Sequence, residues 1–232
     1  MMRILMNVGF EWRKPVKGTV LVVEDSKTIA AVLTGALTQD LSVKCKVACS
    51  LQETKRLLSA GNHFDVAVLD LVLPDARRGE VVDYVVAAGI PSIVFTGEIS
   101  DEIRGAMWGK QIADYIVKDG GRNVLQVTSI VYRLLANMGQ RVLVVDDSAV
   151  ARGLLRTLLE RWNFEVDEAE TGCDGLELLK KHRDYSLIIT DYEMPEMCGV
   201  EFVREVRRLF PKQEVPILGL SAASAASTSA FF

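Results

Sequence analysis

Long apolar runs, paired cysteines and a strong excess of charge of one sign are all missing from this sequence. No uncharged apolar stretch approaches the roughly 20 residues of a bilayer-spanning helix, which argues against a membrane anchor. The formal net charge is only −4 over 232 residues, so the chain as a whole is not attracted to nucleic acid. The 6 Pro and 17 Gly are scattered through a chain that is 49% apolar and 25% charged. This composition excludes collagen-like and disordered proteins.

The cysteines and glycines that are present match no metal or nucleotide motif. The 4 cysteines have neither CxxC spacing nor nearby histidines, which argues against zinc and favours reduced thiols in a cytoplasm. Neither a GxxxxGKS/T loop nor a GxGxxG fingerprint occurs, which argues against a nucleotide-dependent enzyme. We therefore predict a cytoplasmic protein with no direct nucleic-acid or membrane partner.

An internal repeat is the most informative feature of the chain. The phrases VLVVEDS and VLVVDDS lie 122 residues apart, and each is followed by apolar residues at helical spacing. Further on, VAVLDLVLPD around Asp70 is matched by LIITDYEMPE around Asp191, and SIVFTGE around Thr96 by PILGLSA around Ser221. Two copies of one fold explain these matches and also the length, which exceeds that of a typical single domain.

Each copy has the pattern of an α/β fold. Short apolar runs rich in Val and Ile alternate with helix-like segments, which predicts a doubly wound, five-stranded parallel sheet. The strands of the first copy are expected at Val20–Glu24, Val43–Ala48, Val66–Leu69, Ser92–Phe95 and Asp114–Val117. A closing helix is expected at Arg122–Met138. The hydroxyls of Ser26, Ser50 and Ser148 are placed to cap helices, and Glu53 would complete a capping box with Ser50.

The repeat predicts an N-terminal extension and two domains. The extension covers residues 1–18, the first domain 19–138 and the second 141–232. The second domain is expected to have four strands, the last near Pro216–Leu220, because no counterpart of the fifth strand or of the closing helix follows. An unpaired sheet edge favours pairing with another segment. We therefore expect either a fragment of a longer protein or a partner that completes the sheet.

Acidic side chains are expected to meet at one edge of each sheet, because ligand sites form outside the carboxyl ends of parallel strands. In the first domain the residues at the strand ends are Glu24, Asp25, Asp70, Thr96 and Lys118. In the second domain they are Asp146, Asp147, Asp191 and Ser221. Three converging carboxylates repel one another, and a hard divalent cation with oxygen ligands relieves this repulsion. Mg²⁺ is the natural candidate.

With these residues, the chain resembles two tandem receiver domains of bacterial two-component response regulators, which are CheY-like and have the flavodoxin-like fold. The resemblance spans Thr19–Met138 fully and Arg141–Phe232 in part. It implies the strand order 2-1-3-4-5 and a phosphoacceptor aspartate on the third strand, namely Asp70 and Asp191. A sensor histidine kinase or a phosphotransfer protein would supply the phosphoryl group.

The resemblance also implies roles for the other residues at the strand ends. The Mg²⁺ ligands would be Asp70, Glu24, Asp25 and the backbone carbonyl of Val72 in the first domain, and Asp191, Asp146, Asp147 and the carbonyl of Glu193 in the second. The hydroxyls of Thr96 and Ser221 would bond one phosphoryl oxygen, and Lys118 would pair with another. Tyr115 would be the switch aromatic, which turns inward on phosphorylation together with a movement of Thr96.

The two copies differ in two respects. The stretch from Asp70 to Thr96 is 26 residues long, against 30 from Asp191 to Ser221, which predicts a shorter third helix or loop in the first domain. No counterpart of Lys118 is visible in the second domain. Phosphorylation of the second domain is therefore left open.

These features predict a regulatory phosphoacceptor of a phosphorelay rather than an enzyme. Its phosphorylation would control an output domain outside this sequence, such as a C-terminal diguanylate cyclase. An open alternative is that one copy is a non-phosphorylated docking module or holds a homodimer together. An aspartyl-phosphate phosphatase of the dehalogenase type would need a DxDxT-like arrangement after the first strand, which EDSKT and DDSAV do not supply.

Overall fold

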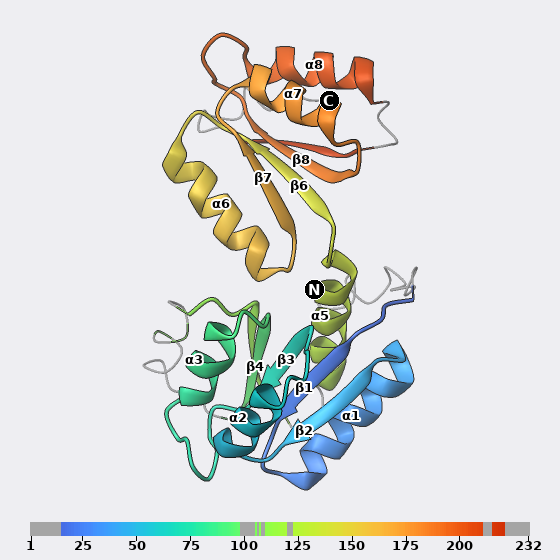
Figure 1. Ribbon diagram of the computed structural model, residues 1–232, viewed down its shortest axis with the longest axis vertical. Coiled ribbons are helices and arrows are strands. Elements are labelled where there is room, and N and C mark those ends of the chain that lie inside the picture. The colour runs from blue at the N-terminus through green and yellow to red at the C-terminus, as the bar shows by residue number, and fades with distance from the viewer. Residues whose placement is uncertain are drawn as a thin grey trace. The chain divides into compact units, whose positions relative to one another are not determined.

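The computed structural model describes residues 15–97, 105, 107, 110–119, 123–210 and 215–220. The chain divides into two compact units, Met1–Ala136 and Asn137–Phe232. Each unit contains a parallel β-sheet with helices on both faces (Figure 1). Within the described residues, no helix has the length and apolar character that a membrane span requires.

The sheet of unit 1 has five parallel strands in the order β2-β1-β3-β4-β5, which confirms the predicted fold class and topology. Its strands are β1 (Thr19–Val23), β2 (Lys44–Ala48), β3 (Val66–Leu69), β4 (Ser92–Thr96) and β5 (Asp114–Val117). Its helices are α1 (Lys27–Leu41), α2 (Leu51–Ser59), α3 (Glu80–Ala87) and α5 (Val124–Asn137). The observed strands lie within one residue of the predicted ones.

The core of unit 1 follows from the continuous apolar runs. Every residue of β3 and β4 is buried, and so is β1 after its first residue, whereas in the edge strand β2 only Ala48 is buried. Leu21 and Val23 of β1 pack with residues of α2 and α3 on one face of the sheet, and α1 and α5 lie on the other (Figure 1). Each fully buried Val or Leu contributes about 1.5–3 kcal/mol, so the sheet forms a rigid base for the loops at its carboxyl edge.

The three serines predicted as helix caps, Ser26, Ser50 and Ser148, each cap a helix. The hydroxyl of Ser26 accepts a hydrogen bond from the Ile29 N–H at 3.5 Å, and that of Ser50 from the Glu53 N–H at 3.1 Å. The predicted capping box is wrong in one detail, because the Glu53 carboxylate accepts from the N–H of Cys49 at 2.8 Å rather than from that of Ser50. The bond reaches one residue further back along the chain, since Ser50 is in an extended conformation.

Unit 2 repeats this topology with four strands among its described residues, in the order β7-β6-β8-β9. Its strands are β6 (Arg141–Val145), β7 (Glu165–Ala169), β8 (Tyr185–Asp191) and β9 (Ile217–Leu220). Its helices are α6 (Ala149–Arg161), α7 (Gly172–Lys181) and α8 (Gly199–Leu209). Residues of α7 and α8 pack on one face of this sheet and residues of α6 on the other.

The helix that follows the third strand differs in length between the units. It has 8 residues in α3 but 11 in α8. The shorter Asp70–Thr96 segment therefore does correspond to a shorter third helix, as the sequence predicted.

Candidate functional site

In unit 1, three carboxylates from two neighbouring strands meet at the carboxyl edge of the sheet. Glu24 and Asp25 follow β1, and Asp70 follows β3, which pairs with β1 in parallel register. One oxygen of each carboxylate lies within 4.8 Å of the others. Glu24 and Asp70 are 2% and 7% exposed, whereas Asp25 is open to solvent. The structure thus brings together three of the residues that the sequence singled out.

Lys118 joins this cluster from the end of β5. Its Nζ lies 2.5 Å from Asp70 Oδ2 and 2.7 Å from Glu24 Oε2. The same Nζ lies 5.7 Å from the centre of the Phe95 ring. One ammonium group therefore pairs with two buried carboxylates, which offsets part of the cost of burying them.

The charge balance of the cluster shifts the ionisation of Glu24. Burial raises the pKa of the Glu24 carboxyl above its ordinary value, and the nearby Asp70 adds to this effect. The hydrogen bond and positive charge of Lys118 lower that pKa again without cancelling the rise. A further cation at this place would favour the ionised form of Glu24.

The remaining residues predicted for unit 1 lie around Asp70. The N–H of Val72 donates to Asp70 Oδ1 at 3.3 Å, so the loop after β3 helps to orient the carboxylate. Thr96 ends β4 and is fully buried, and its carbonyl accepts the Lys118 N–H at 2.8 Å. Tyr115 is partly buried and packs against the core cluster beneath α2 and α3.

Unit 2 has a matching acidic cluster of Asp146, Asp147 and Asp191, again with one oxygen of each within 4.8 Å of the others. Asp146 is 6% exposed, and its Oδ1 accepts the Ser148 N–H at 2.8 Å. Burial raises the pKa of Asp146, the hydrogen bond from Ser148 opposes this, and Asp191 and Asp147 add to the rise. Within the part of unit 2 that the structure describes, no lysine is paired with these three carboxylates.

Of the other two residues predicted for unit 2, the structure describes only Glu193. Ser221 lies outside the described residues. Glu193 is exposed in the turn after β8. The cluster of unit 2 is therefore defined by its three aspartates.

Gly199 and Asp75 support the two sites, and the sequence reasoning passed over both. A Cβ at Gly199 would lie 2.2 Å from the backbone oxygen of Asp191, so only glycine allows α8 to begin so close to the strand end. Asp75 accepts the backbone N–H groups of Leu51 and Gln52, both at 2.9 Å, and thereby ties the loop after β3 to the start of α2. The signal for Gly199 was its place shortly after the matched LIITDYEMPE phrase.

The donor set at both clusters suits a small, hard divalent cation. Three carboxylates can each offer one oxygen to a common point, and Mg²⁺ and Ca²⁺ prefer oxygen ligands. Burial disfavours the ionised form of Glu24 and of Asp146, and a cation would reverse that preference. Both sites therefore have the chemistry of a metal site at the end of a parallel sheet.

Comparison with known proteins relates both halves of the chain to one family. The family model described as the response regulator receiver domain matches residues 20–128 and again residues 142–231. Over 81 residues the chain is 40% identical to the two-component response regulator ORR5 of Oryza sativa subsp. japonica, and over 79 residues it is 40% identical to a chemotaxis protein CheY homolog of Campylobacter jejuni subsp. jejuni. These alignments cover 35% and 34% of this chain. The chain spans 60% and 61% of the length of these curated relatives.

Two solved structures are similar over most of the chain. Both are described as two-component system response regulator/GGDEF domain proteins. The first has a TM-score of 0.82 and 32% identity, and the match covers 92% of this chain and 87% of the other. The second has a TM-score of 0.81 and 31% identity, with the same coverage.

Proposed function

The chain belongs to the response regulator receiver domain family, and on this basis we propose that it accepts a phosphoryl group on Asp70 in a Mg²⁺-dependent reaction. The observation that carries this proposal is the meeting of Glu24, Asp25 and Asp70 at one point, with Lys118 Nζ 2.5 Å from Asp70 Oδ2. Under this proposal Asp70 is the nucleophile, Glu24 and Asp25 are metal ligands, and Lys118 is a cation held beside them. A histidine kinase or a phosphotransfer protein would be the phosphodonor, and we place the reaction in the cytoplasm.

The residues of unit 1 would prepare Asp70 for in-line attack. A bound Mg²⁺, held by Glu24, Asp25, Asp70 and the Val72 carbonyl, would neutralise charge on the transferred group. The Asp70 carboxylate is oriented by the Val72 N–H and by Lys118. One of its oxygens would form a bond to phosphorus while the phosphorus–nitrogen bond of the donor histidine breaks, and that electron pair stays on the imidazole. Lys118 would then balance charge on a phosphoryl oxygen.

The acyl phosphate formed on Asp70 would act as a switch. The hydroxyl of Thr96 would bond a phosphoryl oxygen, and Tyr115 would turn inward as the loop after β4 moves. Such a change biases a pre-existing equilibrium between two conformations. The GGDEF domain named for the two similar solved structures supports the proposal that the switch controls an output domain of that kind, for which a diguanylate cyclase is our candidate.

The role of unit 2 is a separate question. Its acidic trio supports Mg²⁺ binding and phosphorylation of Asp191, in which Ser221 would take the part of Thr96 and Glu193 would supply a carbonyl. An alternative is that unit 2 is a non-phosphorylated docking or homodimerisation module. The observation that favours this alternative is that, in the described part of unit 2, no lysine is paired with Asp191 as Lys118 is with Asp70.

The proposal is tested by intact-mass measurement after incubation with acetyl phosphate and MgCl₂. The unaltered chain is expected to gain the mass of one phosphoryl group, or of two if Asp191 also reacts. Asp70→Asn should remove the first addition and Asp191→Asn the second, and EDTA should prevent both. A chain that gains no phosphoryl group under any of these conditions would refute the proposal.

A further inference from the structure

An open groove of about 640 Å³ lies beside the acidic cluster of unit 1, between α1 and the carboxyl end of β2. Its floor consists of small or apolar side chains, namely Ala30, Ala31, Thr34 and Val47. Val47 is 41% exposed there, so apolar surface faces solvent. Glu24 and Asp25 line both the groove and the acidic cluster. An occupant of the groove would therefore lie next to the proposed phosphoacceptor.

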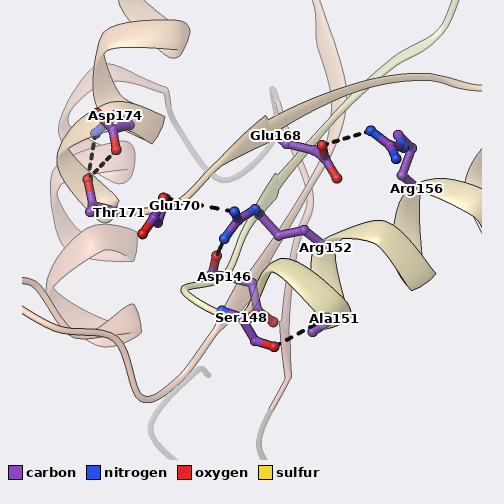
Figure 2. Close-up of polar contacts among 9 residues, drawn as sticks. All are labelled: Asp146, Ser148, Ala151, Arg152, Arg156, Glu168, Glu170, Thr171 and Asp174. Carbon is purple, nitrogen blue, oxygen red and sulfur yellow. Dashed lines mark hydrogen bonds and ion pairs between the residues drawn. The ribbon is translucent and has the colours of Figure 1, made fainter.

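The corresponding place in unit 2 is occupied by the unit's own arginines, which reach across from α6 to β7 and the residue after it (Figure 2). Arg152 donates through Nη1 to the backbone oxygen of Asp146 at 2.6 Å, and its Nη2 lies 3.9 Å from Glu170 Oε2. One turn further along α6, Arg156 Nη1 lies 3.1 Å from Glu168 Oε2. Two arginine–glutamate pairs thus cover this surface of unit 2.

Both members of each pair are replaced in unit 1. The helix caps Ser26 and Ser148 are equivalent, and the strand pairing of Val23 with Ala48 corresponds to that of Val145 with Ala169. These equivalences place Ala30 and Cys49 where unit 2 has Arg152 and Glu170. In the same way, Thr34 and Val47 stand where unit 2 has Arg156 and Glu168. The four replacements together remove the cations and uncover the floor of the groove.

The groove of unit 1 keeps a negative rim. Asp25 and Glu53 both line it, and bonds from the side chain and backbone of Cys49 lower the pKa of Glu53, which keeps that carboxylate ionised at neutral pH. Among the residues that line the groove, the positively charged one is Lys27 at the start of α1. Carboxylates therefore outnumber cations around an apolar floor, and this combination suits a long side chain with an apolar stem and a cationic end.

We propose that this groove binds an arginine side chain presented by the protein that phosphorylates Asp70, an inference that rests on the function proposed above. The aliphatic stem would lie on Val47 and Ala31. The planar guanidinium would pair with the Glu53 carboxylate and with the Asp25 oxygen that does not face the metal site, because its fork of N–H donors matches carboxylate geometry better than an ammonium group does. In unit 2 the same surface is closed by Arg152 and Arg156, so the two units differ in the partner they accept.

The test uses nuclear magnetic resonance of the ¹⁵N-labelled full chain titrated with N-acetylarginine amide. We expect saturable shifts at the backbone amides of Ala31, Val47 and Cys49, and none at their unit 2 counterparts, Gly153, Glu168 and Glu170. N-acetylcitrulline amide has the same shape without the charge, and it should bind about fivefold more weakly, as expected for loss of a partly exposed ion pair. Added salt should weaken the arginine probe more than the citrulline probe.

A matched variant closes the groove from within the chain. Thr34→Arg with Val47→Glu reproduces the pair formed by Arg156 and Glu168, and it should abolish the shifts while the other amides of unit 1 keep their positions. The converse exchange of both pairs, Arg152→Ala and Arg156→Thr with Glu168→Val and Glu170→Cys, should make the unit 2 surface responsive to the probe.

The outcomes separate this inference from the proposed function. Equal binding of arginine and citrulline, or no shift in the groove, would overturn the arginine site even if acetyl phosphate labels Asp70 of the unaltered chain. Persistence of the shifts in the closed-groove variant would also overturn it. Failure of acetyl phosphate to label the unaltered chain would instead refute the function, whatever the groove binds.

Discussion

Lys118→Met should destabilise unit 1 strongly in the absence of divalent cations. The substitution keeps an unbranched side chain but removes the ammonium group that lies 2.5 Å from Asp70 and 2.7 Å from Glu24. Both carboxylates are less than one-tenth exposed, and breaking a buried pair costs about 3–5 kcal/mol. Because Asp25 opens the cluster to solvent, we expect a smaller loss, of about 2–3 kcal/mol at neutral pH.

The loss should shrink in acid. The pKa of Glu24 is already raised in the folded protein, mainly by burial, and removing Lys118 takes away the charge that lowers it. A carboxyl with a raised folded pKa stabilises the fold below its unfolded pKa, and this contribution is lost as pH rises through the folded pKa. Below the ordinary Glu pKa, the variant should therefore approach the unaltered chain. Mg²⁺ should likewise stabilise Lys118→Met more than the unaltered chain, because a bound cation replaces the missing charge.

Hydrogen exchange measured by mass spectrometry can follow this effect separately in each unit. At neutral pH the β3 peptide should exchange roughly 30- to 150-fold faster in Lys118→Met, whereas the β8 peptide of unit 2 should not change. Lys110→Met is the matched control, because its 2.6 Å ion pair with Asp83 is largely exposed on the Asp83 side. Lys110→Met should lower the stability of unit 1 by less than about 1 kcal/mol. Equal exchange in the two variants, with no extra protection by Mg²⁺, would refute the reasoning.

Further expectations concern the residues that support the two sites. Asp75→Ala should destabilise α2 at neutral pH by removing the acceptor of two N–H groups. Because those bonds lower the pKa of Asp75, the difference in stability between the variant and the unaltered chain should vanish as pH falls through the folded pKa. Urea unfolding of both proteins at neutral pH and below that pKa measures this difference. Gly199→Ala should cost unit 2 about 1–3 kcal/mol, because its Cβ would lie 2.2 Å from the Asp191 oxygen. Gly153→Ala meets no atom within 4 Å and should be neutral or slightly stabilising; similar β8 exchange in these two alanine variants would contradict the steric argument.

The fold could be predicted because its strands and helices carry strong local patterns. Runs such as VAVL are buried on both faces in β3, and a run of this kind is typical of a central parallel strand. Serine hydroxyls at the predicted positions cap α1 and α6. The capping detail at Glu53 was wrong because the N–H groups of Cys49 and Ser50 are neighbours along the chain. The extended conformation of Ser50 decides which of the two the Glu53 carboxylate reaches.

The acidic clusters were predictable from the repeat, since the carboxyl ends of neighbouring parallel strands share one edge of a sheet. The same rule placed Lys118 at this edge, but it did not predict that one ammonium group pairs with both Asp70 and Glu24. The tie between Asp75 and the start of α2 is also a contact between distant segments. Neither contact leaves a periodic pattern in the chain.

Two related parallel sheets, each with three carboxylates at its carboxyl edge, follow directly from the order of the residues along the chain. Hydrophobic period and strand ends are local properties, so the residues specify them directly. Two other features become visible only in the folded protein. Lys118 pairs with two carboxylates of unit 1, and arginines of unit 2 cover the surface that corresponds to the open groove of unit 1. These features depend on how far side chains from different elements reach across a packed surface, and that distance exists only once the chain has folded.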